Sequence, residues 1–329
     1  MLSTKNHPII ICAANASGKT QISLALASLI GAEIISADSR QIYKHLTYGT
    51  SKPQGKWTKT PQREIYLVDG IPYHLIDFVD PIETYSVARY LYDFKNVLSQ
   101  INTSRVIICG GTGFYINAVF NPLDPLPEKN IEIRSQLQEY AQKYGREKLH
   151  DKLKELDPES AKRIHPNNIQ RVIRAIEICL ITSKPFSSLI SNKLFENRLG
   201  NAFSVFIIWD KKLLRQRIYK RTIDIFEKWV SETALLISNG YPNDSPGLKS
   251  LGYPEILSYL SSEISKEEAI ERITLKSIQY AKRQNTWFRR YSHKMILEIN
   301  SESQFEPYRI AREIIKKYES TYHNNKTEI

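Results

Sequence analysis

The stretch IIICAANASGKT at residues 9–20 constrains the fold most strongly. Its apolar start is typical of a strand buried on both faces of a parallel sheet. Its end matches the phosphate-loop pattern G-x-x-x-x-G-K-[ST] at Gly18, Lys19 and Thr20, while Ala13 stands where the first glycine belongs. The sequence therefore predicts a strand that leads into a phosphate-binding loop.

The residues after this loop predict a repeated strand, loop and helix arrangement. Apolar residues recur at helical spacing up to Gly31, a typical helix end, and EIISADS then supplies a second strand followed by Asp38. The segment RVIICGGTG predicts another strand, which leads into a glycine loop that contains Thr112. Because such loops gather at the carboxyl ends of parallel strands, we expect both glycine loops and Asp38 to share one crevice.

The loop has the chemistry that a phosphate requires. Gly18 lets the backbone approach the phosphate oxygens, and amides at the start of the helix donate hydrogen bonds to them. Lys19 adds a positive charge, and the Thr20 hydroxyl can ligate Mg²⁺. Ala13 costs about 1–2 kcal/mol only if its position requires a left-handed backbone. An ordinary strand-to-helix turn is the alternative, and the flanking strand and helix favour phosphate binding.

Other polar residues allow more than one interpretation. Asp38 suits a Mg²⁺ ligand, a ribose ligand or a general base, and either Asp38 or Ser39 can cap a following helix. Thr112 can bind substrate or stabilise a tight turn. Arg171 and Arg174, at i and i+3, suit a diphosphate, an RNA backbone or a solvated helix face.

The chain divides into three segments. Residues 1–123 carry the first part of the α/β core, and the proline-rich linker NPLDPLPEKN begins at Asn121. Residues 124–202 are charged and helical in pattern, which predicts an inserted helical domain. Residues 203–329 return to a strand, FSVFIIWD, and continue as basic amphipathic helices, one opened by the capping box of Ser265 and Glu268.

Composition indicates the kind of partner. The net charge of +11 favours a polyanion, although an anionic membrane surface is open on charge alone. The three cysteines, Cys12, Cys109 and Cys179, are too dispersed for a disulfide framework or a zinc cluster, which suits a reducing compartment. No run approaches the roughly 20 apolar residues of a membrane span. We expect a cytoplasmic protein that does not use a membrane.

Eight blocks, in order along the chain, resemble the tRNA dimethylallyltransferase family, also called the tRNA isopentenylpyrophosphate (IPP) transferases. They are ASGKT, EIISADSRQIYKHLTYGTSKP, YHLIDFVDP, YSVARY, GGTGFYINAV, DPESAKRIHPNNIQRVIRAIEICLITSKP, LGYPEILSYL and YAKRQNTWFRR. The resemblance implies a P-loop NTPase-like parallel-sheet core with a helical insertion domain and basic C-terminal helices.

It also implies an activity: transfer of a dimethylallyl group from dimethylallyl diphosphate to N6 of adenosine 37 in the tRNA anticodon stem-loop, assisted by Mg²⁺. Asp38 matches the family's general base and Thr112 a substrate-contacting threonine, while Thr20 matches the metal ligand. The implied diphosphate ligands are Ala13, Ala14, Asn15, Ala16, Ser17, Gly18, Lys19 and Thr20. The implied tRNA contacts are Asp38, Ser39, Arg40, Gln41, Thr112, Arg134, Gln170, Arg171, Val172, Ile173 and Arg174.

The chain departs from the family pattern at several places. Besides Ala13 within AAN, the departures are Asn168, Trp229, Thr233 and Lys276. They motivate one alternative, a tRNA-binding homologue with impaired catalysis. A second alternative is a small-molecule kinase, since the same loop would suit ATP. We expect a monomer.

Overall fold

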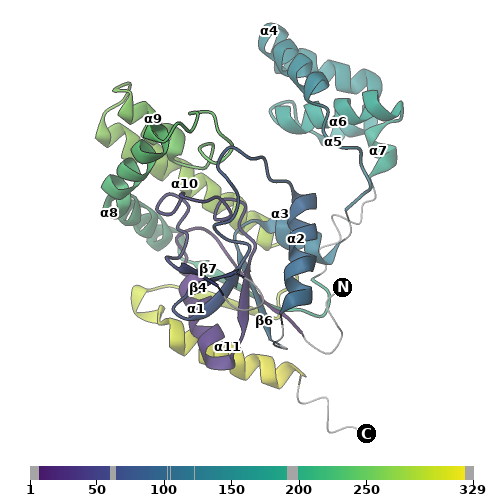
Figure 1. Ribbon diagram of the computed structural model, residues 1–329. Coiled ribbons are helices and arrows are strands. Elements are labelled where there is room, and N and C mark those ends of the chain that lie inside the picture. The colour runs from purple at the N-terminus through teal and green to yellow at the C-terminus, as the bar shows by residue number, and fades with distance from the viewer. Residues whose placement is uncertain are drawn as a thin grey trace, which may run out of the picture. The chain divides into compact units, whose positions relative to one another are not determined.

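The computed structural model describes residues 7–59, 64–101, 103, 105–121, 123–190 and 199–322. The chain forms two compact units, one of Met1–Phe120 with Asn197–Ile329 and one of Asn121–Glu196 (Figure 1). The larger unit contains the sheet and the smaller one is helical. The boundaries predicted at residues 123 and 202 lie a few residues from these.

A central sheet runs through the larger unit. Its order is β3-β4-β5-β2-β6-β1-β7-β8. The strands are β1 (Ile9–Ala13), β2 (Glu33–Ser36), β3 (Lys56–Lys59), β4 (Glu64–Val68), β5 (Ile71–His74), β6 (Val106–Gly110), β7 (Phe203–Trp209) and β8 (Met295–Ile299). The strands from β5 to β8 in this order are parallel, and β3 and β4 form an antiparallel edge. The predicted α/β class with a parallel core is confirmed.

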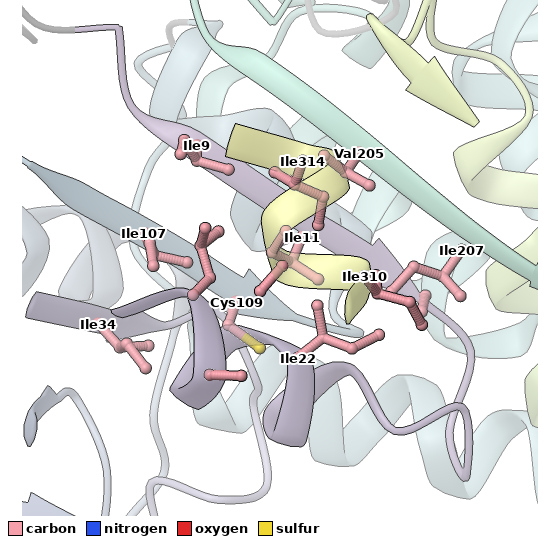
Figure 2. Packing of buried hydrophobic residues seen from close by; sticks show 14 of the residues in the cluster. Ile9, Ile11, Ile22, Ile34, Ile107, Cys109, Val205, Ile207, Ile310 and Ile314 are labelled. Atoms are coloured by element: carbon pink, nitrogen blue, oxygen red, sulfur yellow. The ribbon is translucent and has the colours of Figure 1, made fainter. Parts of the chain in front are cut away.

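Strand β1 is buried on both faces, as its unbroken apolar sequence predicts. Ile9 and Ile11 point to one face, because alternate residues of a strand point the same way. On that face they pack with residues of α1 (Lys19–Ile30) and α11 (Pro307–Tyr322), as Figure 2 shows. The first and last helices of the described chain therefore share one core.

The opposite face of β1 has its own core. Ile10 and Cys12 pack there with residues of α2 (Val87–Gln100) and α3 (Gly113–Phe120). Helix α2 begins at Ser86, whose side chain accepts a hydrogen bond from the Arg89 amide at 3.2 Å. The sheet is therefore covered on both sides, which leaves the carboxyl ends of its strands as the place for a site.

Three further helices pack beyond this sheet in the same unit. They are α8 (Lys211–Ser238), α9 (Tyr253–Leu260) and α10 (Lys266–Phe288). Their shared core includes Ile42 and Leu46 from the segment after β2. Ser265 caps α10 by accepting from the Glu268 amide at 3.2 Å, as its sequence predicts. None of the described helices is long and apolar enough to cross a bilayer.

The smaller unit is a cluster of helices with a separate core. Its helices are α4 (Ile131–Leu156), α5 (Pro158–Arg163), α6 (Ile169–Thr182) and α7 (Phe186–Leu189). Leu149, Leu153 and Val172 are each 0% exposed at its centre. No strand lies among the described residues of this unit, in agreement with its helical sequence pattern.

The sequence analysis did not predict the antiparallel strands β3 and β4 at the edge of the sheet. Strands β4 and β5 are joined by Asp69 and Gly70, whose φ angles are 50° and 79°. An Asp-Gly pair with two positive φ angles is the favoured two-residue hairpin turn. The hairpin was therefore detectable in the sequence VDGI.

Gly31, at the end of α1, provides a test of backbone conformation alone. Its φ is 63°, and a Cβ built there meets nothing within 4 Å. Gly31→Ala should lower the free energy of unfolding by about 1 kcal/mol, because an L side chain in this conformation is strained. Urea denaturation measures the loss. Gly31→Asn should lose less, since Asn tolerates left-handed backbone, and equal losses for both variants would contradict the explanation.

Candidate active site

The phosphate loop begins inside the sheet. Ala13 is the last residue of β1 and pairs with Ile207 of β7. The left-handed residues of the loop are Ala16, with φ 58°, and Gly18, with φ 79°. Ala13 is therefore in extended backbone, and its replacement of glycine introduces no strain.

Side chains from distant parts of the chain anchor the loop. The Trp209 indole donates to the Ser17 carbonyl at 3.0 Å, and Arg217 Nε donates to the Ala16 carbonyl at 3.1 Å. The Phe305 ring lies against Gly18, so that a Cβ there would be 2.1 Å from the ring. Gly18 is thus required both by its positive φ and by the close ring.

The loop presents unused polar groups. No side chain caps the N-terminus of α1, so its first amides point out of the helix without a capping acceptor. Asn15 Oδ1 and Ser17 Oγ are buried, without a hydrogen-bond partner among the described residues. Amides at a helix N-terminus bind anions, so the amides and the Ser17 hydroxyl fit a phosphate group, whereas Asn15 Oδ1 only accepts hydrogen bonds and can bind a donor such as water.

The residues also fit Mg²⁺ held together with a phosphate. Thr20 lines the cavity at the loop and offers a hydroxyl ligand. Among the described residues no cluster of three His, Cys, Asp or Glu side chains forms a protein-only metal cage. Mg²⁺ commonly binds few protein ligands and keeps water and substrate phosphates, which this arrangement allows.

The loop opens into a cavity of about 780 Å³. Its charged lining is mainly basic, with five cations and three carboxylates: Lys19, Arg40, Arg217, Lys220 and Arg221, and Asp38, Asp224 and Glu302. Arg217 forms an ion pair with Glu302 at 2.5 Å. The remaining excess of positive charge favours an anionic ligand.

Arg221 contributes much of that positive charge. It forms no ion pair with a carboxylate in the part of the chain that the structure describes, and its Nη2 donates only to the Tyr48 carbonyl, at 3.4 Å. Burial lowers its pKa to about 10, which still leaves the group charged at neutral pH. A guanidinium that is desolvated and weakly paired gains from binding a diphosphate.

Thr112 binds the two neighbours of Asp38 and is not among the residues that line the cavity. The Thr112 amide donates to the Ala37 carbonyl at 3.1 Å, and Thr112 Oγ1 accepts from the Ser39 amide at 2.9 Å. Asp38 lines the cavity, and its Oδ1 accepts from the Arg40 amide at 2.9 Å. Asp38 therefore faces the cavity and also stabilises the turn that follows it. Within the described residues 7–59 no helix begins at this turn, so the interpretation of Asp38 or Ser39 as a helix cap is wrong.

Helix α10 adds an aromatic residue beside this carboxylate. Tyr280 lines the cavity, and burial together with the charge of Asp38 raises the pKa of Tyr280 to about 12. It therefore stays protonated near neutral pH and can donate a hydrogen bond.

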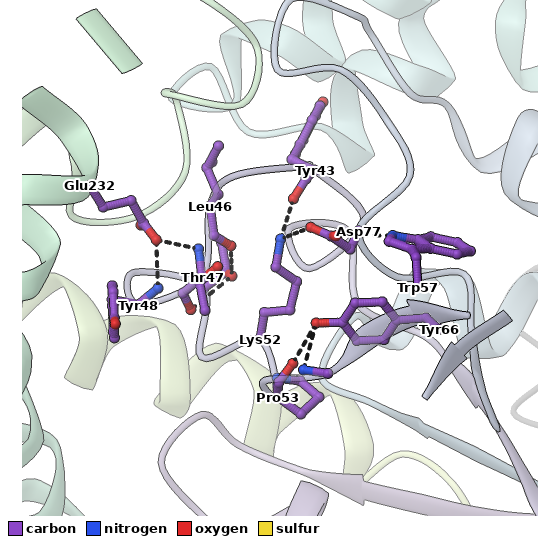
Figure 3. Close-up of polar contacts among 12 residues, drawn as sticks. Tyr43, Leu46, Thr47, Tyr48, Lys52, Pro53, Trp57, Tyr66, Asp77 and Glu232 are labelled. Atoms are coloured by element: carbon purple, nitrogen blue, oxygen red, sulfur yellow. Dashed lines mark hydrogen bonds and ion pairs between the residues drawn. The ribbon is translucent and has the colours of Figure 1, made fainter. Parts of the chain in front are cut away.

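A buried ion pair supports another wall of the cavity (Figure 3). Lys52, 5% exposed, forms an ion pair with Asp77 and donates to the Tyr43 carbonyl at 2.7 Å. Nearby, Glu232 Oε2 accepts from the Thr47 amide at 2.6 Å. These contacts fix the segment that carries Gly49, Thr50 and Ser51 into the cavity wall.

Trp229, one of the departures from the family pattern, fills a space left by two glycines. A Cβ at Gly49 would lie 2.4 Å from the indole, and one at Gly252 would lie 1.9 Å from it. Thr233 Oγ1 donates to the Trp229 carbonyl at 2.8 Å. This departure is therefore accommodated by packing and keeps the cavity wall intact.

In the helical unit, two of the three predicted RNA-contacting arginines, Arg134 and Arg174, share one buried carboxylate. Glu177 is 0% exposed and accepts from Arg134 Nε at 2.9 Å and from Arg174 Nη1 at 2.7 Å. The Asn130 amide donates to it at 2.7 Å. Through Glu177, Arg134 links helix α4 to helix α6, and Arg174 strengthens this contact. Both arginine side chains are partly exposed.

The other predicted RNA contacts on α6 differ in how exposed they are. Gln170 and Arg171 are exposed, whereas Val172 and Ile173 are 0% exposed in the core of the unit. The side chains of Val172 and Ile173 therefore position α6 and do not reach its surface. RNA contact by Gln170, Arg171 and Arg174 stays a prediction.

Several residues of the cavity escaped the sequence analysis. Arg217 and Arg221 are spaced i and i+4 on α8, and Gln284 lies on α10. The spacing of the arginines was a usable signal, because it places both on one helix face. Gln284 lies within the family block YAKRQNTWFRR, but nothing in its spacing connects it to the phosphate loop, because only the fold brings them together.

A mostly parallel sheet with a P-loop-like turn after its first strand defines the class: a P-loop-type α/β protein with a predominantly basic cavity beside that turn. The IPP transferase family model matches residues 41–291. The tRNA dimethylallyltransferase of Elusimicrobium minutum is 44% identical over 287 residues, 87% of this chain and 92% of the relative. This chain belongs to the IPP transferase family.

A solved structure agrees. The tRNA isopentenylpyrophosphate transferase of Bacillus halodurans is 30% identical, with a TM-score of 0.62, and the match covers 97% of this chain and 99% of that one. A eukaryotic dimethylallyltransferase acting on tRNA, 24% identical with a TM-score of 0.72, shows the same fold.

Ala13→Gly tests the loop's conformation. Because Ala13 is extended and paired in the sheet, the change should leave binding of dimethylallyl diphosphate within about twofold. It should cost about 0.5–1 kcal/mol of stability through backbone entropy. Calorimetric titration and urea denaturation measure the two effects. Gly18→Ala is the control and should abolish binding; a clear affinity change in Ala13→Gly would refute this account.

Glu177→Gln tests the buried arginine cluster. Burial raises the pKa of Glu177, but hydrogen bonds from Arg134 and Arg174 outweigh it and hold the pKa below its ordinary 4.5. The carboxylate therefore stabilises the fold above about pH 4.5, and this contribution is lost as pH falls through the lowered value. At pH 7 the variant should lose about 2–4 kcal/mol.

Urea denaturation of both proteins at neutral and acidic pH measures this difference. The gap between wild type and Glu177→Gln should shrink as the wild-type carboxylate becomes protonated. A gap that is equal at pH 7 and pH 3.5 would show that the charge of Glu177 does not stabilise the cluster.

Proposed function

We propose that this chain transfers the dimethylallyl group of dimethylallyl diphosphate to N6 of adenosine 37 in tRNA and releases diphosphate. The observation that carries the proposal is one cavity in which Asp38 lies with an uncapped phosphate loop and the weakly paired Arg221. Family membership and the names of the relatives support the same reaction.

The phosphate loop binds the donor. Amides at the start of α1, with Lys19 and Arg221, hold the diphosphate, and Thr20 provides a ligand for Mg²⁺. When bound, the metal ion adds positive charge at the departing oxygens. As the allylic carbon–oxygen bond breaks, negative charge grows on the diphosphate, where these groups stabilise it.

Asp38 acts on the acceptor. The adenine N6 forms the new bond to the allylic carbon, and the Asp38 carboxylate takes the proton that N6 loses. The adenine has to leave its stack to reach a cavity at the strand ends. Ser39 and Arg40, beside Asp38, contact the RNA in this unit, whereas Gln41 is 3% exposed and its amide holds the Thr50 and Ser51 carbonyls. In the helical unit, the exposed side of α6 provides RNA contacts.

The direct test mixes the protein with Mg²⁺, dimethylallyl diphosphate and a tRNA that carries unmodified adenosines at positions 36–38. Mass analysis should find N6-dimethylallyladenosine at position 37. Retained tRNA without product would indicate the impaired homologue. ATP turnover with a nucleoside, indifferent to tRNA, would indicate a kinase.

Asp38→Asn tests the base. Asn keeps the oxygen that accepts from the Arg40 amide, so the turn should persist while proton acceptance is lost. We expect transfer to fall by at least about 10²-fold, with tRNA affinity within about twofold. Asp38→Ala, which also removes the turn contact, should be at least as impaired. Full activity in Asp38→Asn would show that another group accepts the proton.

A further inference from the structure

Gln284 joins two loops of the active site with one amide. Its Oε1 accepts from the Asn15 amide at 2.8 Å, and its Nε2 donates to the Gly111 carbonyl at 2.9 Å. The side chain is 5% exposed. One partner is a donor and the other an acceptor, so the position needs a group that both accepts and donates.

The two loops carry opposite halves of the site. Asn15 lies in the phosphate loop, three residues before Gly18. Gly111 precedes Thr112, whose hydroxyl holds the amide of Ser39 next to Asp38. A line of hydrogen bonds therefore runs from the donor loop through Gln284 and Thr112 to the residue beside the proposed base.

The close approach to Gly111 is built into the sequence. A Cβ on residue 111 would lie 2.2 Å from Gln284 Nε2. A side chain at residue 111 would therefore push the Gln284 amide away from the carbonyl. The Asn15 amide is bonded to Gln284 and therefore does not bind the phosphate. The amides from Gly18 onward remain available to bind it.

We propose that Gln284 is a positioning residue that fixes the separation between the donor's allylic carbon and the adenine N6, resting on the function proposed above. It acts through Asn15 and Gly111, because both hydrogen bonds of its amide go to these two loops. A misplacement of about 1 Å between reacting groups can lower the rate about 10²-fold. The two hydrogen bonds of Gln284 therefore affect the transfer step more than the binding of either substrate.

Two variants of Gln284 separate this role from simple packing. Gln284→Met keeps the length of the side chain and removes both hydrogen bonds. Gln284→Glu retains them only when protonated, because the acid form can donate to Gly111 and accept from Asn15, whereas the carboxylate cannot donate. Burial raises the pKa of the introduced carboxyl from its usual value of about 4.3, whereas the cations of the cavity lower it, so the pH series extends to both sides of that value.

The experiment measures kcat and KM for dimethylallyl diphosphate over a pH series, and anticodon stem-loop affinity without donor. Each rate is divided by the wild-type rate at the same pH, which cancels titration of Asp38 and of the substrate. Gln279→Glu is the matched control, because it makes the same change at an exposed position of α10.

The Gln284→Glu ratio should fall about tenfold per pH unit above the pKa of the new carboxyl and recover on acidification, whereas the control ratio stays flat. Gln284→Met should lose about 10²-fold in kcat/KM at every pH, with RNA affinity within about twofold.

Three results would overturn the proposal: a pH-independent ratio for Gln284→Glu, wild-type kcat/KM in Gln284→Met, or a loss of RNA affinity as large as the loss of rate. The last would make Gln284 an RNA contact. If Gln284→Met does not fold, the pH profile of Gln284→Glu decides alone. Absence of transfer by the wild-type protein would refute the proposed function, and this inference with it.

Discussion

The structure depends on burial of β1 on both faces. A strand covered by two cores cannot shift along its neighbours without moving apolar side chains out of both. This fixed strand delivers the phosphate loop to one place at the edge of the sheet, where α1 begins. The anchors of the loop, Trp209, Arg217 and Phe305, then act on a backbone whose starting point is already set.

The positive charge of the chain is used in two different ways. In the helical unit, Arg134 and Arg174 are paired with a buried carboxylate and hold two helices together. In the cavity, Arg221 has only a carbonyl partner among the described residues and keeps its charge for a ligand. Net charge therefore predicts the class of partner, but the pairing of each arginine determines whether it binds that partner or stabilises the fold.

Much of the fold could be predicted, because the signals are local. The apolar run of β1, the glycine end of α1 and the capping box of α10 depend on neighbouring residues, and the structure confirms all three. The Asp69–Gly70 hairpin had an equally local signal and was missed because the apolar pattern around it is weak. The site was predictable only in part: Gly18 and Asp38 belong to short motifs, whereas Gln284 reaches Asn15 across 269 positions.

Ala13 and Val172 show two further limits of motif reading. The motif position of Ala13 suggested a strained loop, yet the residue belongs to the strand, where alanine fits. Val172 falls within a block that the family resemblance assigns to RNA contact, but its side chain points into a core. A matched block therefore identifies a helix, and burial then selects which of its residues face outward.

The contact of Phe305 with Gly18 has a consequence for synthesis of the chain. The loop is synthesised before Arg217, Gln284 and Phe305, which hold it. Until they are made, the new chain exposes β1 without its second neighbour, β7, and without α11 over one face. The donor site can therefore assemble only after Phe305 has been synthesised, and the unfinished chain should depend on chaperones to keep the apolar strand β1 from aggregating.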